Sequence, residues 1–289
     1  MSDGYNKIMF SYLHGYHAGN AADVLKHSAL LFCLDYLKKK EKPLLCVDTH
    51  AGAGFYDLSN REWERGIGRL REAAGEQPPM IAGYVKSSDG KRYPGSSVIM
   101  ARALSGGDRL VCYELHPQEF EALEASMEEL RGRGGPTIEP RREDGPGGLK
   151  SLLPPPSRRG LVFIDPPWEE QSENESIPRS VLDGLRRFPE GTFIIWYPLL
   201  SLPKVADNGP SPREALFALS GKRRCRAELG APSEKLKHGT ENSPRGMYGS
   251  GLLIYNPPWT LKSALEEALP FLASALYDDE RAWRLDWED

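Results

Sequence analysis

A short apolar strand followed by an acidic, small-residue loop constrains the fold of this chain more than any other feature. Pro43 to Val47 is apolar, and Asp48-Thr49-His50-Ala51-Gly52-Ala53-Gly54 follows it directly. The first strand of a nucleotide-binding α/β sheet ends in such a loop, where missing side chains let a ligand approach the backbone. The segment has neither the Gly-Lys-Ser/Thr of a P-loop nor Gly-x-Gly-x-x-Gly. It therefore favours a nucleoside-like cofactor over one bound through a pyrophosphate.

Two further predicted strands lead to acidic residues. Leu110 to Glu114 is a second core strand, and an acid at that position suits the hydroxyls of a ribose. The alternative is an exposed glutamate at a strand end. Thr137 to Arg141 is a third strand, and the chain turns away from it at Asp144-Gly145. Asp144 is therefore expected to reach the base of a cofactor.

The predicted fourth strand, Leu161 to Ile164, ends in Asp165-Pro166-Pro167-Trp168. Ligands bind at the carboxyl edge of such sheets, and adjacent prolines fix φ and remove two backbone donors. A planar base with an amino group fits this corner, because a carboxylate and a carbonyl can accept its two N–H bonds while Trp168 stacks on the ring. The alternative is a strand exit stiffened by proline, with a tryptophan on the surface.

Residues 57–94 interrupt the alternation of strands and helices. They are polar, with helical patterns around 61–74 and 80–88, which predicts a small helical insertion. We expect an α/β core formed by residues 1–56 and 95–289, and an inserted helical subdomain at 57–94. Ser96 is expected to cap a helix at 98–104 or to bind a carboxylate. The remaining predicted elements are a fifth strand at 192–197, a helix at 213–220 and a final antiparallel pair at 224–230 and 250–255.

Three aromatic residues and two histidines fall in the glycine-punctuated stretch from Phe10 to Asn20. Its lack of periodicity predicts an ordered arm, in which Tyr12 stacks on a substrate and His14 donates a hydrogen bond. A tail packed on the core through its aromatic rings is the alternative. A helix is predicted at about 21–40, with Lys26 and His27 in its early turns.

Composition limits the class of protein. The net charge is −4, so any nucleic-acid binding must rest on local patches. The four cysteines, which form no Cys-x-x-Cys pair, are expected to be reduced core residues in a cytoplasmic protein, without a metal site or a disulfide. No apolar run is long enough to span a membrane.

In this order, the motifs resemble those of S-adenosylmethionine-dependent adenine N6-methyltransferases. The chain more closely resembles the family of bacterial ribosomal RNA large subunit methyltransferase J, which modifies an adenine of 23S ribosomal RNA. The likeness spans nearly the whole chain, and the stretches that carry it are Ser11-Tyr12, His17-Ala18-Gly19-Asn20, Ala22-Asp23-Val24-Leu25-Lys26-His27, Asp48 to Gly54, Tyr93-Pro94-Gly95-Ser96, Glu114-Leu115-His116-Pro117, Ser157 to Pro167, Trp196-Tyr197-Pro198, Arg245-Gly246-Met247 and Asn256-Pro257-Pro258-Trp259.

The resemblance implies a Rossmann-like class I methyltransferase sheet, S-adenosyl-L-methionine as cofactor, and a monomer that acts on ribosomal RNA, free of protein or early in assembly. It implies substrate or catalytic roles for Tyr12, His14 and Lys26, with Asp165 as the acid that orients or deprotonates the adenine N6. The family usually has tyrosine at Trp168, a change that keeps stacking and loses a hydroxyl. The implied cofactor contacts are His27, His50, Ser96, Glu114, Asp144, Gly145 and Asp165.

Three alternatives remain open at this point. A DNA adenine-N6 methyltransferase would use the same chemistry. A protein-glutamine methyltransferase would use Asn256-Pro257-Pro258-Trp259, which repeats the shape of the Asp165 motif. The third is a non-catalytic RNA-binding protein that retains a cofactor pocket.

Overall fold

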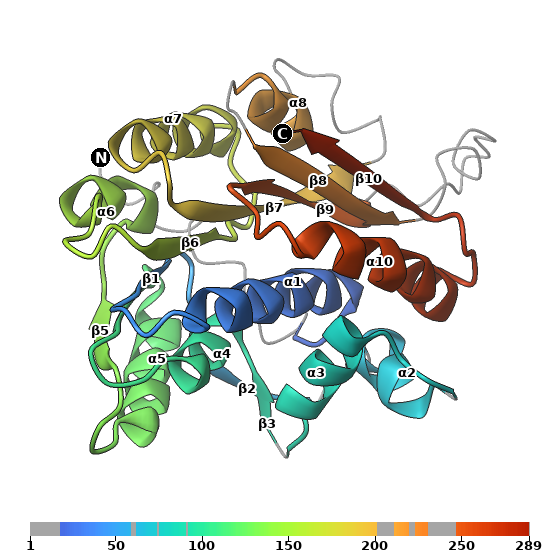
Figure 1. Cartoon of the computed structure of the whole chain (residues 1–289), viewed down its shortest axis with the longest axis horizontal. Coiled ribbons are helices and arrows are strands. Elements are labelled where there is room, and N and C mark those ends of the chain that lie inside the picture. The colour runs from blue at the N-terminus through green and yellow to red at the C-terminus, as the bar shows by residue number, and fades with distance from the viewer. Residues whose placement is uncertain are drawn as a thin grey trace, which may run out of the picture.

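The computed structural model of the chain describes residues 18–58, 62–73, 75–90, 92–200, 211–219, 223–230 and 247–288. Its main feature is an eight-stranded sheet with the order β10-β8-β9-β7-β6-β1-β4-β5 (Figure 1). The strands of this sheet are β1 (Leu45–Asp48), β4 (Arg109–Tyr113), β5 (Thr137–Arg141), β6 (Gly160–Ile164), β7 (Thr192–Leu200), β8 (Arg224–Gly230), β9 (Met247–Tyr255) and β10 (Trp283–Glu288).

The sheet is largely parallel. β5, β4, β1, β6 and β7 run in one direction, and β9 lies antiparallel to both β7 and β8. From β1 the chain builds outward to β4 and β5, and then returns to the other side of β1 with β6. The carboxyl ends of β1 and β6 therefore flank the switch point at which ligands bind in open α/β sheets. The predicted α/β class with a mostly parallel sheet is confirmed.

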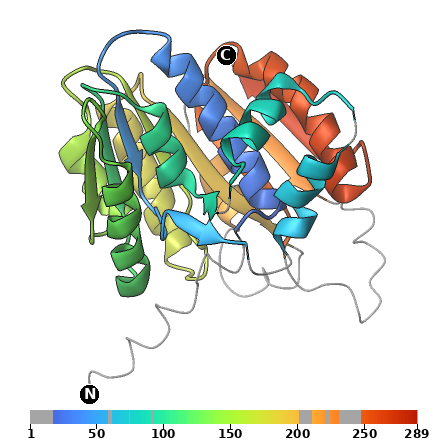
Figure 2. The ribbon, with the colours of Figure 1, turned by 90° about the horizontal axis from the view of Figure 1, so that it is seen from below.

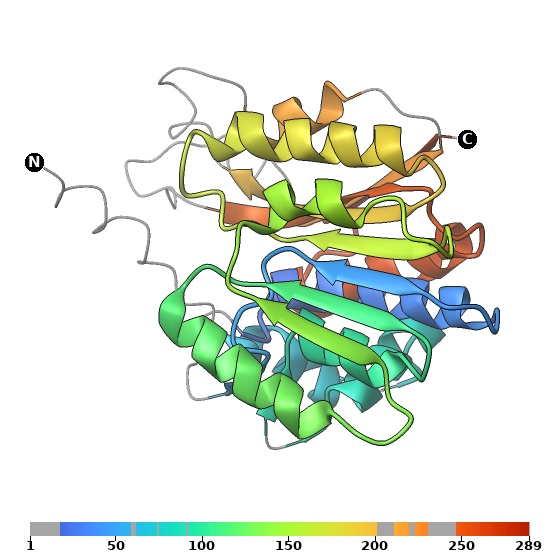
Figure 3. The ribbon, with the colours of Figure 1, turned by 90° about the vertical axis from the view of Figure 1, so that its left-hand side faces the viewer.

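Helices cover both faces of the sheet, and each face has its own hydrophobic core. Figure 3 shows α6 and α7 on one side of the strands and α5 on the other. Because alternate residues of a strand point to opposite faces, Leu161, Phe163 and Ile194 pack in one core, while Val162 and Ile195 pack in the other. The helices are α1 (Ala21–Lys38), α4 (Ser96–Ala103), α5 (Pro117–Leu130), α6 (Gly145–Leu152), α7 (Glu173–Arg187), α8 (Pro212–Phe217) and α10 (Leu261–Tyr277).

Helix α1 packs against β9 of the sheet and against its neighbours α4 and α10 on the same face (Figure 2). It begins after Asn20, whose side chain accepts hydrogen bonds from the N–H groups of Ala22 (2.9 Å) and Asp23 (3.0 Å). At its other end, the Arg159 guanidinium donates to backbone carbonyls that include that of Leu37. Arg159 thus satisfies carbonyl groups at the end of this helix.

The segment at 57–94 packs against α1 and α10 through short helices (Figure 1). These are a 3-10 turn, η3 (Trp63–Arg65), followed by α2 (Ile67–Glu72) and α3 (Pro79–Ser87). They lie between two short strands, β2 (Phe55–Asp57) and β3 (Arg92–Pro94), which pair with each other. The sequence had not indicated this pairing, since a three-residue strand has too little pattern to recognise.

Several other predicted elements can be compared with the structure. Strand β5 has the predicted bounds, 137–141. The final antiparallel pair exists, but β10 adds an edge strand that was not predicted. The four cysteines are buried and form no disulfide, as predicted. Among the described residues, no helix has the length and hydropathy that crossing a membrane requires.

Candidate active site

A cavity of about 420 Å³ lies at the carboxyl ends of β1, β4, β5 and β6. This volume is within the range of pockets that bind small molecules. The structure brings eight of the predicted site residues to its walls, although they come from six separate stretches of the chain. These eight are His27, His50, Ser96, Glu114, Asp144, Gly145, Asp165 and Pro166.

Glu114 is held at the cavity wall by two backbone donors. Its carboxylate accepts from the N–H of Gly52 (2.9 Å) and from the N–H of His116 (2.8 Å), one bond to each oxygen. Carboxylate oxygens have further lone pairs, so the group can accept two more hydrogen bonds from adjacent hydroxyls. This is the chemistry that a ribose diol needs.

Gly52 has no room for a side chain. Its φ is +58°, and a Cβ at this position would lie 1.9 Å from the Tyr56 hydroxyl oxygen. That hydroxyl accepts a hydrogen bond from the N–H of Ala53 (3.0 Å), which fixes it beneath the loop. The loop after β1 therefore presents bare backbone to the cavity beside Glu114, and these residues fit a nucleoside-type cofactor.

Replacing Glu114 with glutamine is expected to weaken the binding of S-adenosylhomocysteine by about 10- to 100-fold, because a neutral amide accepts more weakly and offers only one oxygen. Calorimetry on the two proteins measures the change. Glu124→Gln, on the same side of the sheet in α5, is the matched control. Equal affinity in Glu114→Gln and wild type would show that this carboxylate does not bind the ligand.

Asp48, at the end of β1, is fully buried beneath the cavity. The Ser96 hydroxyl donates to it at 2.6 Å, and the N–H of His50 donates at 3.3 Å. Burial raises the pKa of Asp48 to about 7, because desolvation outweighs these hydrogen bonds. Of the two roles expected for Ser96, helix capping was wrong, because Gly95 is the N-cap residue; the Ser96 hydroxyl instead donates to the carboxylate of Asp48.

His50 stays uncharged at neutral pH, because burial lowers its pKa to about 3. Its Nδ1 lies 2.8 Å from the Thr49 hydroxyl, which itself donates to the carbonyl of Phe163. Thr49 therefore fixes the ring at the cavity wall. Because the one Thr49 proton goes to Phe163, Nδ1 of His50 is the donor to Thr49, and Nε2 can accept one hydrogen bond without adding charge.

The buried Asp48 predicts a pH dependence of stability. A folded-state pKa of about 7, against 3.8 for the free group, means that the folded protein binds a proton which the unfolded chain releases between these values. The associated stability is complete below the lower value and is lost as the pH rises through about 7. Asp48→Asn should therefore unfold several degrees above wild type at about pH 8, with little difference at about pH 4. Thermal unfolding without ligand tests this; parallel curves for the two proteins would contradict it.

The acidic corner after β6 contains a buried ion-pair cluster. Lys26 Nζ in α1 lies 2.6 Å from Asp165 Oδ2 and 2.9 Å from Asp23 Oδ1. The ammonium group also lies 5.2 Å from the centre of the Trp196 ring, within range of a cation–π contact. Asp165 keeps 11% of its side chain exposed, against 4% for Lys26. The carboxylate of Asp165 is thus fixed by Lys26 and remains accessible from the cavity.

Trp196 is a pocket residue that reasoning from individual motifs missed. It is 9% exposed, lines the cavity, and its indole N–H has no hydrogen-bond partner among the described residues. β6 and β7 are parallel with Ile164 opposite Ile195, so the next residues, Asp165 and Trp196, extend side by side. The available signal was an aromatic residue on the strand expected beside the Asp165 motif.

Trp168 has positive φ (+53°), and its indole N–H donates to the carbonyl of Trp196 at 3.1 Å. It is partly buried and packs against both cores, whereas Trp196 and Pro167 line the cavity. Trp168 therefore lies beside the Asp165 corner but does not line this cavity. Tyr12 and His14 lie outside the described residues.

Asn256 does not face the cavity. Its side-chain amide donates to the carbonyls of Pro189 (2.7 Å) and Gly191 (2.8 Å). It follows Tyr255, which pairs with Phe193 near the start of β7, so it lies at the opposite edge of the sheet from Asp165. This structural role removes the basis for a protein-glutamine methyltransferase.

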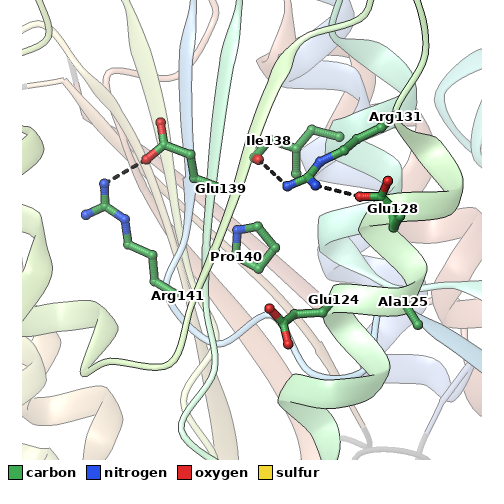
Figure 4. Close-up of a pocket in the computed structure, with 8 residues that line it drawn as sticks. All are labelled: Glu124, Ala125, Glu128, Arg131, Ile138, Glu139, Pro140 and Arg141. Atoms are coloured by element: carbon green, nitrogen blue, oxygen red, sulfur yellow. Dashed lines mark hydrogen bonds and ion pairs between the residues drawn. The ribbon is translucent and has the colours of Figure 1, made fainter.

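A second hollow, of about 650 Å³, lies between α5 and the outermost strand β5 (Figure 4). Four of its charged side chains form two pairs: Arg131 binds Glu128 at 2.5 Å, and Arg141 binds Glu139 at 2.8 Å. It contains none of the predicted site residues. Across the described residues, no cluster of His, Cys, Asp or Glu has the composition of a metal site.

Comparisons with known proteins point to one family. The family model described as "Ribosomal RNA large subunit methyltransferase D, RlmJ" matches residues 41–289. The chain is 35% identical to ribosomal RNA large subunit methyltransferase J of Haemophilus influenzae, over 96% of this chain and 99% of that protein. The protein of the same name from Escherichia coli is 34% identical, with 93% and 94% covered. A crystal structure of a Legionella pneumophila protein is 30% identical, covers 94% of this chain and 98% of its own, and superposes with a TM-score of 0.77.

Proposed function

We propose a specific reaction for this chain, which belongs to the ribosomal RNA large subunit methyltransferase J family and is thus a transferase of one-carbon groups. The reaction is transfer of a methyl group from S-adenosyl-L-methionine to the exocyclic N6 of an adenine in large-subunit, 23S-type ribosomal RNA. The observation that carries the proposal is the position of Asp165. Its carboxylate and Pro166 share one cavity with the Glu114–Gly52 cradle.

The cofactor contacts follow from the cavity walls. When bound, S-adenosyl-L-methionine supplies an electrophilic methyl group on a sulfonium. We assign the ribose hydroxyls to Glu114, and Asp144 to the base. The remaining contacts are assigned to His27, His50, Ser96, Gly145 and Asp165, which surround the same cavity.

Asp165 acts on the amino group of the substrate base. The lone pair of adenine N6 is delocalised into the ring, which makes it a poor nucleophile. Hydrogen bonds from N6 to Asp165 and to the Pro166 carbonyl localise this pair and aim it at the methyl group. Lys26 contacts Oδ2 of Asp165 and fixes the rotation of the carboxylate, which leaves Oδ1 for the N–H bond. The N6 proton released on transfer leaves through Asp165.

The base must leave its stack to reach this corner, since a stacked adenine cannot enter a closed pocket. We assign stacking on the extruded base to Trp168, with Tyr12 and His14 of the amino-terminal arm completing the substrate side. The hydrogen bond from Trp168 to the Trp196 carbonyl supports this role, because it holds the indole beside the Asp165 corner. The substrate is ribosomal RNA free of protein or early in assembly, and the protein acts as a monomer.

We also propose that residues 57–94 form an inserted helical subdomain in a core made of 1–56 and 95–289. The succession β2, η3, α2, α3, β3 supports these boundaries, because the two strands pair and so close the insertion at its base.

The test is mass mapping of N6-methyladenine in ribosomal RNA from cells with and without this protein. One modified adenine of the large-subunit RNA is expected to lose its methyl group when the protein is absent and to regain it when the gene is restored. Competition between ribosomal RNA and DNA in one methyl-transfer assay separates this proposal from a DNA methyltransferase. Preferential methylation of DNA, or no methylation of either, would contradict it.

A further inference from the structure

A chain of three buried side chains connects the inserted helices to the cavity. The Tyr84 hydroxyl in α3 lies 2.7 Å from the Tyr93 hydroxyl in β3, and the Tyr93 hydroxyl lies 2.8 Å from Nδ1 of His27 in α1. Tyr84 and Tyr93 are fully buried, and His27 is 1% exposed while forming part of the cavity wall. The two tyrosines do not line the cavity, and His27 is the cavity residue that the Tyr93 hydroxyl contacts.

Counting protons shows which group donates and which accepts in each of these two hydrogen bonds. A phenol hydroxyl donates one hydrogen bond, and a neutral imidazole has one donor and one acceptor nitrogen. Within the part of the chain that the structure describes, the Tyr84 hydroxyl has Tyr93 as its hydrogen-bond partner and no other. If Tyr93 donated to Tyr84, the Tyr84 proton would have no acceptor in a buried site, which is unfavourable.

The favourable order is therefore Tyr84 donating to Tyr93, and Tyr93 donating to His27. In this order Nδ1 of His27 accepts, so the imidazole proton lies on Nε2. We propose that Tyr93 and Tyr84 are positioning residues that hold His27 as the Nε2–H tautomer, which presents an N–H donor to an acceptor atom of the bound cofactor.

This inference rests on the proposed function for the identity of the ligand, but the tautomer itself does not depend on it. It also gives the insertion a role at the pocket. Tyr84 is the residue of α3 that reaches the Tyr93 hydroxyl, so docking of this helix against α1 completes the chain that orders His27. The buried packing of the three rings adds to this order, with the His27 and Tyr93 ring centres 5.9 Å apart.

Nitrogen NMR of the imidazole groups in the ligand-free protein tests the tautomer directly. The chain has six histidines, and the loss of one signal in His27→Gln assigns that residue. Wild type is expected to show an unprotonated Nδ1 and a protonated Nε2 at His27. An Nδ1–H tautomer in wild type would overturn the proposal, whether or not any variant folds.

Three variants then test whether the two tyrosines determine the His27 tautomer. Tyr93→Phe is expected to give a mixture of tautomers and about tenfold weaker binding of S-adenosylhomocysteine by calorimetry, because Nδ1 loses its donor. Tyr84→Phe should weaken binding by about two- to threefold, since Tyr93 can still donate. Tyr36→Phe, at the other end of α1, is the control and should match wild type.

An unchanged His27 spectrum together with unchanged affinity in Tyr93→Phe would overturn the role of the tyrosines. If wild type failed to bind S-adenosylhomocysteine, the proposed cofactor would be wrong, and the tautomer measurement would still decide the present inference.

Discussion

Asp165→Asn is expected to lower kcat for methyl transfer by about 10³-fold, within the range that a positioned proton acceptor contributes. Asparagine keeps the shape of the side chain but removes the charge that polarises the amino group of the substrate. The fold should survive, because Lys26 retains its contact with Asp23 at 2.9 Å and no buried cation is left without a partner. Affinity for S-adenosylhomocysteine should change much less than kcat.

Single-turnover methylation of protein-free ribosomal RNA measures this effect, with thermal unfolding as the check on folding. Asp183→Asn is the control, since Asp183 lies on the exposed side of α7 in an ion pair with Arg186. Near-normal turnover in Asp165→Asn would remove the proposed chemistry.

Lys26 gives a second measurement on the same corner. If Lys26 acts by orienting Asp165, then Lys26→Met combined with Asp165→Asn should lose little more activity than Asp165→Asn alone. Additive losses in kcat would instead indicate that Lys26 contacts the substrate independently, because residues that act as one unit are not additive.

Gly145→Ala is expected to destabilise the protein by about 3 kcal/mol, at the upper end of overpacking effects. A Cβ on Gly145 would lie 2.2 Å from the carbonyl oxygen of Thr49 and 2.7 Å from its Cα. These are backbone atoms of the loop after β1, so they cannot move aside by changing a rotamer. The collision therefore pushes apart the loop after β1 and the start of α6, both of which form the cavity.

Cofactor affinity should consequently fall by more than tenfold in Gly145→Ala, since Thr49, His50 and Gly145 line one cavity. Thermal unfolding and calorimetry measure the two effects. Gly83→Ala is the matched control: it lies within α3 with open space around it, so alanine should stabilise the protein by about 0.5–1 kcal/mol. A Gly145→Ala protein as stable as wild type would contradict the tight contact between these loops.

Local chemistry explains which elements could be predicted from the sequence. Helix α5 has Pro117 at its first position and a capping His116, and β5 is followed by the N-cap residue Asp144. Such signals are contained within a few residues of the element. The hairpin β2–β3 and the edge strand β10 form through pairing with distant segments, so their short sequences carry little indication of structure.

The site residues also include some that local sequence indicates and others that it does not. Glu114 and Asp165 can be recognised because each follows a strand. The carboxyl ends of parallel strands lie at the same edge of the sheet, so such residues come together whatever their separation in sequence. The sequence does not indicate which side chain pairs with each of these acids. Lys26 and Asp165 are 139 residues apart, and nothing local links them. His27, Tyr93 and Tyr84 likewise meet through the packing of the insertion on α1, and Trp196 joins the corner through the register of β6 and β7.

The most direct test of the account is a crystal structure with S-adenosylhomocysteine and adenosine bound together. We expect the sulfur to face the corner formed by Asp165 and Pro166, the ribose of the homocysteine ligand to bind Glu114, and the N6 of adenosine to lie within hydrogen-bond distance of Asp165. Adenosine bound away from Asp165, or a homocysteine sulfur turned away from this corner, would contradict the proposed transfer.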